Sequence, residues 1–234
     1  MQLFFVPGVQ NDELIFNETE SKHAVKVLRL GKGDQVQVID GTGGFYLAEI
    51  VDPNQKKCRL SVLKTQKEYG KRNFNLHIAI APTKNTDRLE WFLEKATEIG
   101  IDQITPLLCE HSERKSIKPD RFERILISAM KQSVKAYLPQ LNTLTSFSDF
   151  VNTCTASQKF IAHCYEGEKP HLKNVVAEGE SVVVLIGPEG DFSPEEVNQA
   201  KAIGFQEISL GNARLRTETA GVVACHIVNL MNEK

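Results

Sequence analysis

Cysteine is scarce in this chain, and its positions form no recognisable pattern. The number of cysteines is odd and no two are spaced as CxxC, which argues against a disulfide framework and a zinc site. A reducing compartment is the better expectation, so we expect a cytoplasmic protein with no bound metal. The five residues are Cys58, Cys109, Cys154, Cys164 and Cys225.

Long apolar runs and a large excess of one charge are also lacking. No stretch of about 18 apolar residues occurs, so no membrane span is expected. The N-terminal apolar segment lacks a basic flank, and Pro7 interrupts it early, unlike a signal peptide. Lysine and arginine number 28 against 30 acidic residues, for a net charge of −2. This balance excludes a strongly basic nucleic-acid coat but allows a local basic patch.

Familiar nucleotide and hydrolase motifs are absent as well. The chain has no GxxxxGK(S/T), HExxH, GxSxG or EF-hand pattern. The segment Gly41-Thr42-Gly43-Gly44 lacks the third glycine of GxGxxG and opens no helix, so it gives little support to a Rossmann site. The six histidines are scattered. One of them, His77, falls inside an apolar strand, where a satisfied core histidine is a simpler interpretation than a metal ligand.

The N-terminal part of the chain consists of short, closely spaced strands and turns. One helical stretch intervenes, with Ser21 as its expected N-cap and Gly31 at its end. This pattern predicts a small β-barrel. The expected strands are residues 3–6, 35–39, 45–51 and 58–63.

Residues 65–73 contain no aliphatic side chain and are interpreted as a linker. Beyond them, strands alternate with helices, which predicts an α/β domain with a mainly parallel sheet. Ser193-Pro194-Glu195-Glu196, for example, combines a capping residue, a first-turn proline and acidic residues typical of a helix start. We therefore expect two domains, at residues 1–70 and 74–234.

Two glycine-containing segments follow predicted strands, where ligands bind in open α/β sheets. In the first, a buried strand runs into Gly187-Pro188-Glu189-Gly190 and then into the capped helix. Its glycines would let backbone groups approach a cofactor closely, although a tight strand-to-helix turn is an equally good interpretation. In the second, Leu210-Gly211 precedes Arg214 and Arg216 at another helix start. Two arginines there suit an anionic or RNA partner, and pairing with acidic neighbours on the surface is the alternative.

Basic side chains gather in two places. One is a short segment around Lys22, His23 and Arg29. The other runs from His111 to Lys135, where seven basic residues stand against three acidic ones. A solvated helix face explains the second segment on composition alone, and a surface for RNA phosphates is the functional alternative.

Taken together, these motifs resemble the RsmE family of small-subunit ribosomal RNA methyltransferases, within the SPOUT superfamily. The glycine loop with Phe192-Ser193, and Leu215-Arg216-Thr217-Glu218-Thr219-Ala220 after Leu210-Gly211, carry the resemblance. Further matches are His23 with Val27-Leu28-Arg29, Lys84, Arg88, Glu90, Lys95-Ala96-Thr97-Glu98-Ile99-Gly100, Ser112-Glu113-Arg114 and Gln132-Ser133, so the resemblance covers essentially the whole chain.

The resemblance implies a SPOUT-type α/β domain with a C-terminal trefoil knot at about residues 181–234, preceded by a PUA-like β-barrel that binds RNA. It implies a homodimer that uses S-adenosylmethionine (SAM) to methylate N3 of a uridine in the decoding region of 16S ribosomal RNA, within the small ribosomal subunit. A related SPOUT enzyme acting on transfer RNA or another nucleotide, and a non-catalytic RNA-binding module, are the alternatives.

The resemblance also assigns site residues. Arg216 is expected to stabilise the negative charge on the uracil, and Glu218 is a candidate base, with helix capping as its structural alternative. Cofactor contacts are expected from Ile186, Gly187, Pro188, Glu189, Gly190, Leu210, Gly211, Leu215 and Thr217. RNA contacts are expected from Lys22, His23, Arg29, Arg88, Arg114, Arg121, Lys131 and Lys135.

The chain departs from the family pattern at three places. Asp191 replaces the last glycine of the usual GPEGG loop. Ala213 stands where the family has arginine, and Arg214 follows it. Lys131 and Lys135 stand where the family often has an acid and an arginine.

Overall fold

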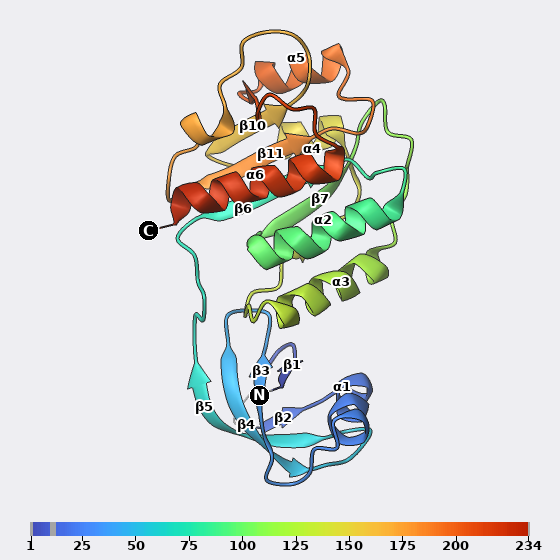
Figure 1. Ribbon diagram of the computed structural model, residues 1–234, viewed down its shortest axis with the longest axis vertical. Coiled ribbons are helices and arrows are strands. Elements are labelled where there is room, and N and C mark those ends of the chain that lie inside the picture. Colours follow the sequence, from blue (N-terminus) through green and yellow to red (C-terminus); the bar gives the residue numbers. More distant parts are fainter. Residues whose placement is uncertain (1, 10–12, 234) are drawn as a thin grey trace. The chain divides into compact units, whose positions relative to one another are not determined.

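The computed structural model describes residues 2–9 and 13–233 and divides the chain into two units. The first unit is Met1–Lys71 with Met130–Leu138, and the second is Arg72–Ala129 with Pro139–Lys234. Figure 1 colours the strands of the first unit blue to cyan and most of the second unit green to red. Over the described residues, no helix is long and apolar enough to cross a membrane.

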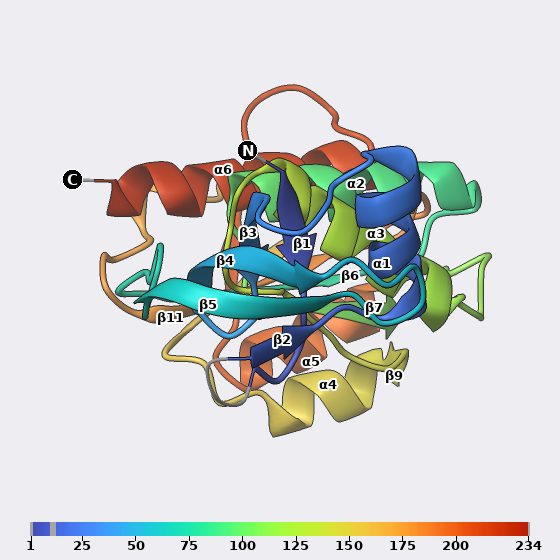
Figure 2. The same cartoon turned by 90° about the horizontal axis from the view of Figure 1, so that it is seen from below.

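A five-stranded sheet forms the first unit, in the order β1-β3-β4-β5-β2. β1 and β3 are parallel, and the other neighbouring pairs are antiparallel. No pairing joins the edge strands β1 and β2 within the described residues, so the small β-barrel predicted from the sequence is a half-barrel sheet. Figure 2 shows β4 and β5 side by side in this sheet. The strands are β1 (Leu3–Phe5), β2 (Glu13–Ile15), β3 (Gln35–Ile39), β4 (Phe45–Asp52) and β5 (Arg59–Gln66).

The helical stretch of this unit begins earlier than predicted. α1 (Glu18–Lys22) is capped by Asn17, whose side-chain oxygen accepts a hydrogen bond from the Glu20 amide at 2.9 Å. Ser21 is therefore not the cap: its buried hydroxyl donates to the Phe16 carbonyl and accepts from the Cys58 amide. A π-helix, His23–Val27, continues α1 and ends before Gly31, so the predicted helix end is also wrong.

Residues 130–138 belong to the first unit, which the sequence pattern did not indicate because Met130 continues the apolar stripe of α3 (Pro119–Gln132). The Leu138 amide donates to the Gly41 carbonyl, and the Gly43 amide donates to the Ala136 carbonyl, both at 2.9 Å. Met130 and Ala136 are buried in one cluster with Ile39. This segment is thus part of the core of the half-barrel unit.

A parallel sheet of seven strands forms the centre of the described part of the second unit, in the order β12-β10-β11-β6-β7-β8, with β9 also paired to β7. All pairings between its described strands are parallel, which confirms the predicted parallel α/β architecture. The strands are β6 (Asn75–Ile80), β7 (Gln103–Leu108), β8 (Gln140–Leu141), β9 (Thr145–Ser146), β10 (Gln158–Ala162), β11 (Ser181–Ile186) and β12 (Gln206–Ile208).

Helices cover both faces of this sheet, so β11 is buried from Val182 to Ile186 and reads as a continuous apolar run. α2 (Thr86–Ile99) and α6 (Thr217–Asn232) lie side by side on one face (Figure 1). α4 (Phe147–Thr153) and α5 (Pro194–Ala202) pack into the core of the other face. A short 3-10 helix, Leu172–Asn174, precedes β11.

His77 in β6 is a satisfied interior residue, as the sequence predicted. Its Nε2 lies 2.8 Å from the Thr105 hydroxyl, and its ring meets Phe150 edge-on at 5.2 Å between centroids. Burial lowers the pKa of His77 to about 4, from an ordinary value of 6.5. Its imidazole is therefore neutral in the folded protein at pH 7.

This shift predicts an acid-dependent loss of stability. Because the folded pKa is lower than the unfolded one, the contribution is complete above about pH 6.5 and is lost as the pH falls towards 4. We expect about 2 kcal/mol less stability at pH 5 than at pH 7 from this residue. Urea unfolding at both pH values should show a smaller fall for His77→Gln, whereas replacement of the exposed His226 by glutamine should change nothing. An equal pH dependence in wild type and His77→Gln would contradict the assignment.

Candidate functional site

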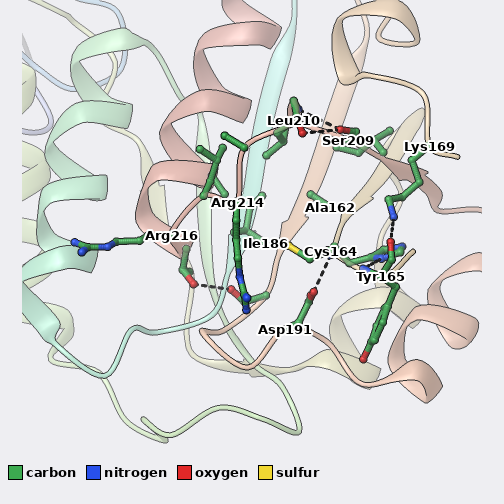
Figure 3. Close-up of a pocket in the computed structure, with 18 of the residues that line it drawn as sticks. Ala162, Cys164, Tyr165, Lys169, Ile186, Asp191, Ser209, Leu210, Arg214 and Arg216 are labelled. Carbon is green, nitrogen blue, oxygen red and sulfur yellow. Dashed lines mark hydrogen bonds between the residues drawn. The ribbon is translucent and has the colours of Figure 1, made fainter. Parts of the chain in front are cut away.

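Three neighbouring parallel strands, β10, β11 and β12, end at the same edge of the second unit's sheet. The segments that follow them surround a cavity of about 840 Å³ (Figure 3). The first wall is residues 163–165, the second 186–191 and the third 208–217. The two glycine-containing segments singled out in the sequence thus meet at one site.

The loop after β11 is tightly built. An added Cβ at Gly187 would lie 3.1 Å from the Phe192 ring and 3.2 Å from the Phe192 backbone nitrogen, so a side chain there would need Phe192 to move. Ser193 and Glu196 form the capping box that starts α5, as the sequence predicted. The glycine loop is therefore fixed at both ends by packing and hydrogen bonds.

Two of the predicted cofactor residues shape this loop. The Glu189 carboxylate accepts a hydrogen bond from the Lys84 amide at 3.0 Å, which ties the loop to the chain after β6. Gly190 does not line the cavity, and its carbonyl faces Nδ1 of His111 at 3.1 Å. All the other residues of the predicted cofactor set line the cavity: Ile186, Gly187, Pro188, Glu189, Leu210, Gly211, Leu215 and Thr217.

The loop after β12 closes over the cavity and leads directly into α6. Gly211 has a backbone φ of 126°, a conformation that only glycine adopts readily. The buried Thr217 hydroxyl donates to the Gly187 carbonyl at 3.1 Å, across 30 residues of chain. This hydrogen bond joins the two glycine-containing loops.

The two arginines of this loop point in different directions. In Figure 3, the Arg214 side chain extends into the cavity, whereas Arg216 points away from it towards α2. Both are exposed, and both line the cavity with part of their surface. Arg214, the arginine displaced by one residue from the family pattern, therefore brings a positive charge into the cavity, which Lys169 also lines.

Glu218 lies just outside the cavity, in the first turn of α6. It is buried, at 7 % exposure, and its Oε1 is 3.9 Å from Nε of Arg88 on α2. The sequence placed Arg88 among RNA contacts, and the structure brings it to the candidate base instead.

The wall formed by residues 163–165, directly after β10, was not singled out in the sequence. The Cys164 amide donates to the Asp191 carboxylate at 2.8 Å. His163 is buried and shares a 2.9 Å contact with Glu207, and burial lowers the pKa of His163. No local motif marks these residues, because only strand adjacency brings them to the site.

The two other predicted RNA contacts in the second unit, Arg114 and Arg121, have hydrogen-bond or ion-pair partners within that unit. Arg114 donates to the backbone carbonyls of Thr83 and Lys84, at 3.0 and 2.7 Å. Arg121 pairs with Glu90, and an Arg121 nitrogen lies 2.6 Å from its carboxylate. Arg114 thus ties the segment after β7 to the segment after β6, and Arg121 ties α3 to α2.

In the first unit, Lys131 and Lys22 each pair with a carboxylate. Lys131 is half-buried, 2.6 Å from Glu20, with its ammonium over the Phe4 ring. Lys22 pairs with Glu18 one turn earlier, where both groups are exposed. His23 and Arg29 are exposed, and Lys135 is half-buried.

Comparison with known proteins gives the family. Residues 70–229 match the model of the RNA methyltransferase domain, and residues 16–63 match the RNA methyltransferase PUA domain. The ribosomal RNA small subunit methyltransferase E of Synechocystis sp. is 32% identical over 217 residues, which cover 89% of this chain and 70% of the relative. The chain belongs to this family.

Solved structures of the family's fold cover nearly the whole chain. A Porphyromonas gingivalis protein described as a probable rRNA-methyltransferase is 41% identical, with a TM-score of 0.92 over 99% of this chain and 98% of its own. A Legionella pneumophila protein, described as a methyltransferase in complex with bound SAM, is 26% identical, with a TM-score of 0.87 over 98% and 97%. The fold is thus that of an RNA methyltransferase domain with a PUA domain.

No cluster of three or more histidine, cysteine or carboxylate side chains that could hold a metal ion occurs among residues 2–9 and 13–233.

Proposed function

We propose that this protein methylates N3 of a uridine in 16S ribosomal RNA, using SAM. The observation that carries the proposal is the cavity of three strand-end loops, joined by the hydrogen bond from Thr217 to Gly187. Family membership supports the reaction class, and the SAM complex of the Legionella protein supports the cofactor.

The cavity fits the proposed cofactor. Its volume of about 840 Å³ lies within the range of small-molecule sites. Ile186, Leu210 and Leu215 supply apolar walls, and the glycine-containing loops supply backbone donors and acceptors for a purine edge. Gly187 lines the cavity without a side chain, because Phe192 fills the space in which a Cβ would lie. When bound, SAM supplies a methyl group on a positively charged sulfur.

The start of α6 would carry the chemistry on the substrate. Uracil N3 holds a proton in neutral uridine and becomes a good nucleophile only when that proton leaves. We propose that Glu218, held beside Arg88, accepts the proton at its carboxylate. Arg216 extends on this side of α6 and would stabilise the negative charge that spreads onto uracil O2 and O4.

The arginine inside the cavity needs a separate role. We propose that Arg214 faces the anionic part of the cofactor, the carboxylate of its methionine moiety, because its side chain extends between the cavity walls. The two arginines would then divide the work between cofactor and substrate.

The resemblance also suggests a trefoil knot over residues 181–234. Its support here is that the loop leading into α6 crosses the end of β11 and is bonded to Gly187. A homodimer, a cytoplasmic location and the assembled small subunit as substrate remain part of the same proposal.

For RNA binding we propose the exposed face around Lys22, His23 and Arg29 of the first unit. The adjoining π-helix supports this, because such distortions occur often at functional sites. The remaining predicted RNA contacts would then act mainly through contacts within the protein or at its edge: Arg88, Arg114, Arg121, Lys131 and Lys135.

The test is transfer of labelled methyl from SAM to small ribosomal subunits from cells that lack this enzyme. Digestion of the RNA should yield label in 3-methyluridine. Label in another nucleoside would change the target atom, and label only in transfer RNA would move the substrate. No transfer and no SAM binding would leave a non-catalytic RNA-binding module.

A further inference from the structure

Asp191 ends the glycine loop with a backbone φ of 64°. This left-handed conformation favours glycine and, next to it, asparagine and aspartate. Glycine would adopt this backbone conformation without any side chain. The role of the carboxylate at this position must therefore be found in the contacts that it makes.

Both carboxylate oxygens accept hydrogen bonds from backbone amides. Oδ2 accepts from Cys164, which follows β10, and Oδ1 accepts from the adjacent Phe192, both at 2.8 Å. A second link joins the same two loops, because the Tyr165 hydroxyl donates to the Phe192 carbonyl at 2.6 Å. Figure 3 shows Asp191 directed at Cys164 across the cavity floor.

The loop on the Asp191 side is itself well supported. The Asp191 amide donates to the Pro188 carbonyl at 3.0 Å, which closes the turn. Nδ1 of His111 lies 3.1 Å from the carbonyls of both Gly190 and Asp191. The β10 loop reaches the glycine loop through the Asp191 carboxylate and the Tyr165 hydroxyl, and His163 ties it to Glu207.

We propose that Asp191 is a positioning residue of the cofactor cavity, whose carboxylate holds the Cys164 wall against the glycine loop. The proposal rests on the proposed function, because it takes the cavity to be the SAM site. Hydrogen bonds to an ionised acceptor are stronger than neutral ones. Loss of this link should therefore loosen one of the three walls without disturbing the sheet beneath.

Two substitutions separate the carboxylate from the backbone turn. Glycine and asparagine both tolerate a positive φ at this position. Glycine has no side-chain acceptor for a hydrogen bond, and the asparagine side chain has one acceptor oxygen in place of two. We expect SAM affinity, measured by calorimetry, to fall about tenfold in Asp191→Gly and by less in Asp191→Asn. If the position served only the turn, glycine would bind SAM as well as the wild type does.

Cys164 provides a readout that needs no cofactor. It is the exposed cysteine of the described residues, and burial, followed by the Asp191 carboxylate, raises the pKa of its thiol. Loss of the carboxylate should therefore speed alkylation of Cys164 by iodoacetamide at pH 8, measured by peptide mass spectrometry. Glu195→Gln is the matched control, because this substitution removes the same charge from the first turn of α5. Glu195 is exposed and lies outside the cavity lining.

The two readouts distinguish failure of this inference from failure of the proposed function. Suppose that Asp191→Gly binds SAM as tightly as the wild type does but shows faster alkylation of Cys164, and that Glu195→Gln is unchanged in both assays. The link between Asp191 and Cys164 would then exist without serving the cofactor, which overturns the inference and leaves the proposed function standing. Unchanged alkylation in Asp191→Gly also overturns it. A wild-type protein that binds no SAM would overturn the cofactor assignment itself, and the inference with it.

Discussion

Replacement of Gly187 by valine is expected to abolish measurable SAM binding. A Cβ at this position would lie 3.1 Å from the buried Phe192 ring, and valine adds two further methyl groups. Because Phe192 is fully enclosed, the new side chain must either displace it or occupy the cavity. Overpacking of this kind costs about 1–3 kcal/mol, and obstruction of the site adds to it, so we expect affinity to fall by a factor on the order of 100 or more.

Calorimetric titration with SAM checks this result, with thermal unfolding to separate binding from stability. Gly31→Val is the matched control, because an added Cβ there meets nothing closer than 4.0 Å. Gly187→Ala should give an intermediate loss. A Gly187→Val protein that folds and binds SAM with wild-type affinity would show that the cofactor does not occupy this cavity.

Replacement of Glu218 by glutamine is expected to lower kcat for methyl transfer by about 10²–10⁴ while SAM affinity stays unchanged. The amide keeps the shape of the side chain but cannot accept the N3 proton. The carboxylate lies outside the cavity lining and beside Arg88, so its loss should affect the substrate step rather than the cofactor. Single-turnover methyl transfer measures the chemical step directly.

The structural alternative, a carboxylate that favours the start of α6, predicts a different pattern. In that case Glu218→Gln would lower the free energy of unfolding by about 0.5–2 kcal/mol and leave kcat of the folded protein near the wild-type value. Urea unfolding of Glu218→Gln therefore accompanies the kinetics, and Glu195→Gln, in the first turn of α5, gives the cost of losing a carboxylate from a helix start. Unchanged single-turnover rates in the presence of a stability loss would remove Glu218 from the mechanism.

Much of the second unit followed from local patterns in the chain. The expected helix start at Ser193 carries the complete capping box, and β11 occupies the apolar run from Ser181 to Ile186. These features depend on residues close together in sequence, where capping chemistry and burial leave few alternatives. The two glycine-containing loops could be located for the same reason, since each directly follows a strand.

Local patterns failed where a residue's partner is distant. Ser21 was expected to cap a helix, but its hydroxyl is used by Phe16 and by Cys58, 37 residues away. The half-barrel and the place of residues 130–138 in it depend on strand pairing and on contacts such as that between Leu138 and Gly41. Propensity and periodicity carry no information about such pairings.

The sequence by itself determined the alternation of strands and helices in the second unit, the position of the glycine-containing loops and, through its motifs, the family. Only the tertiary structure decided how the site is assembled. It places the β10 loop as one of the three cavity walls and Arg88 beside Glu218, and it directs the Arg214 side chain, rather than that of Arg216, into the cavity. The physical reason is that hydrogen bonds, packing and charge act between groups close in space. The parallel sheet brings together the ends of strands that are far apart in the chain.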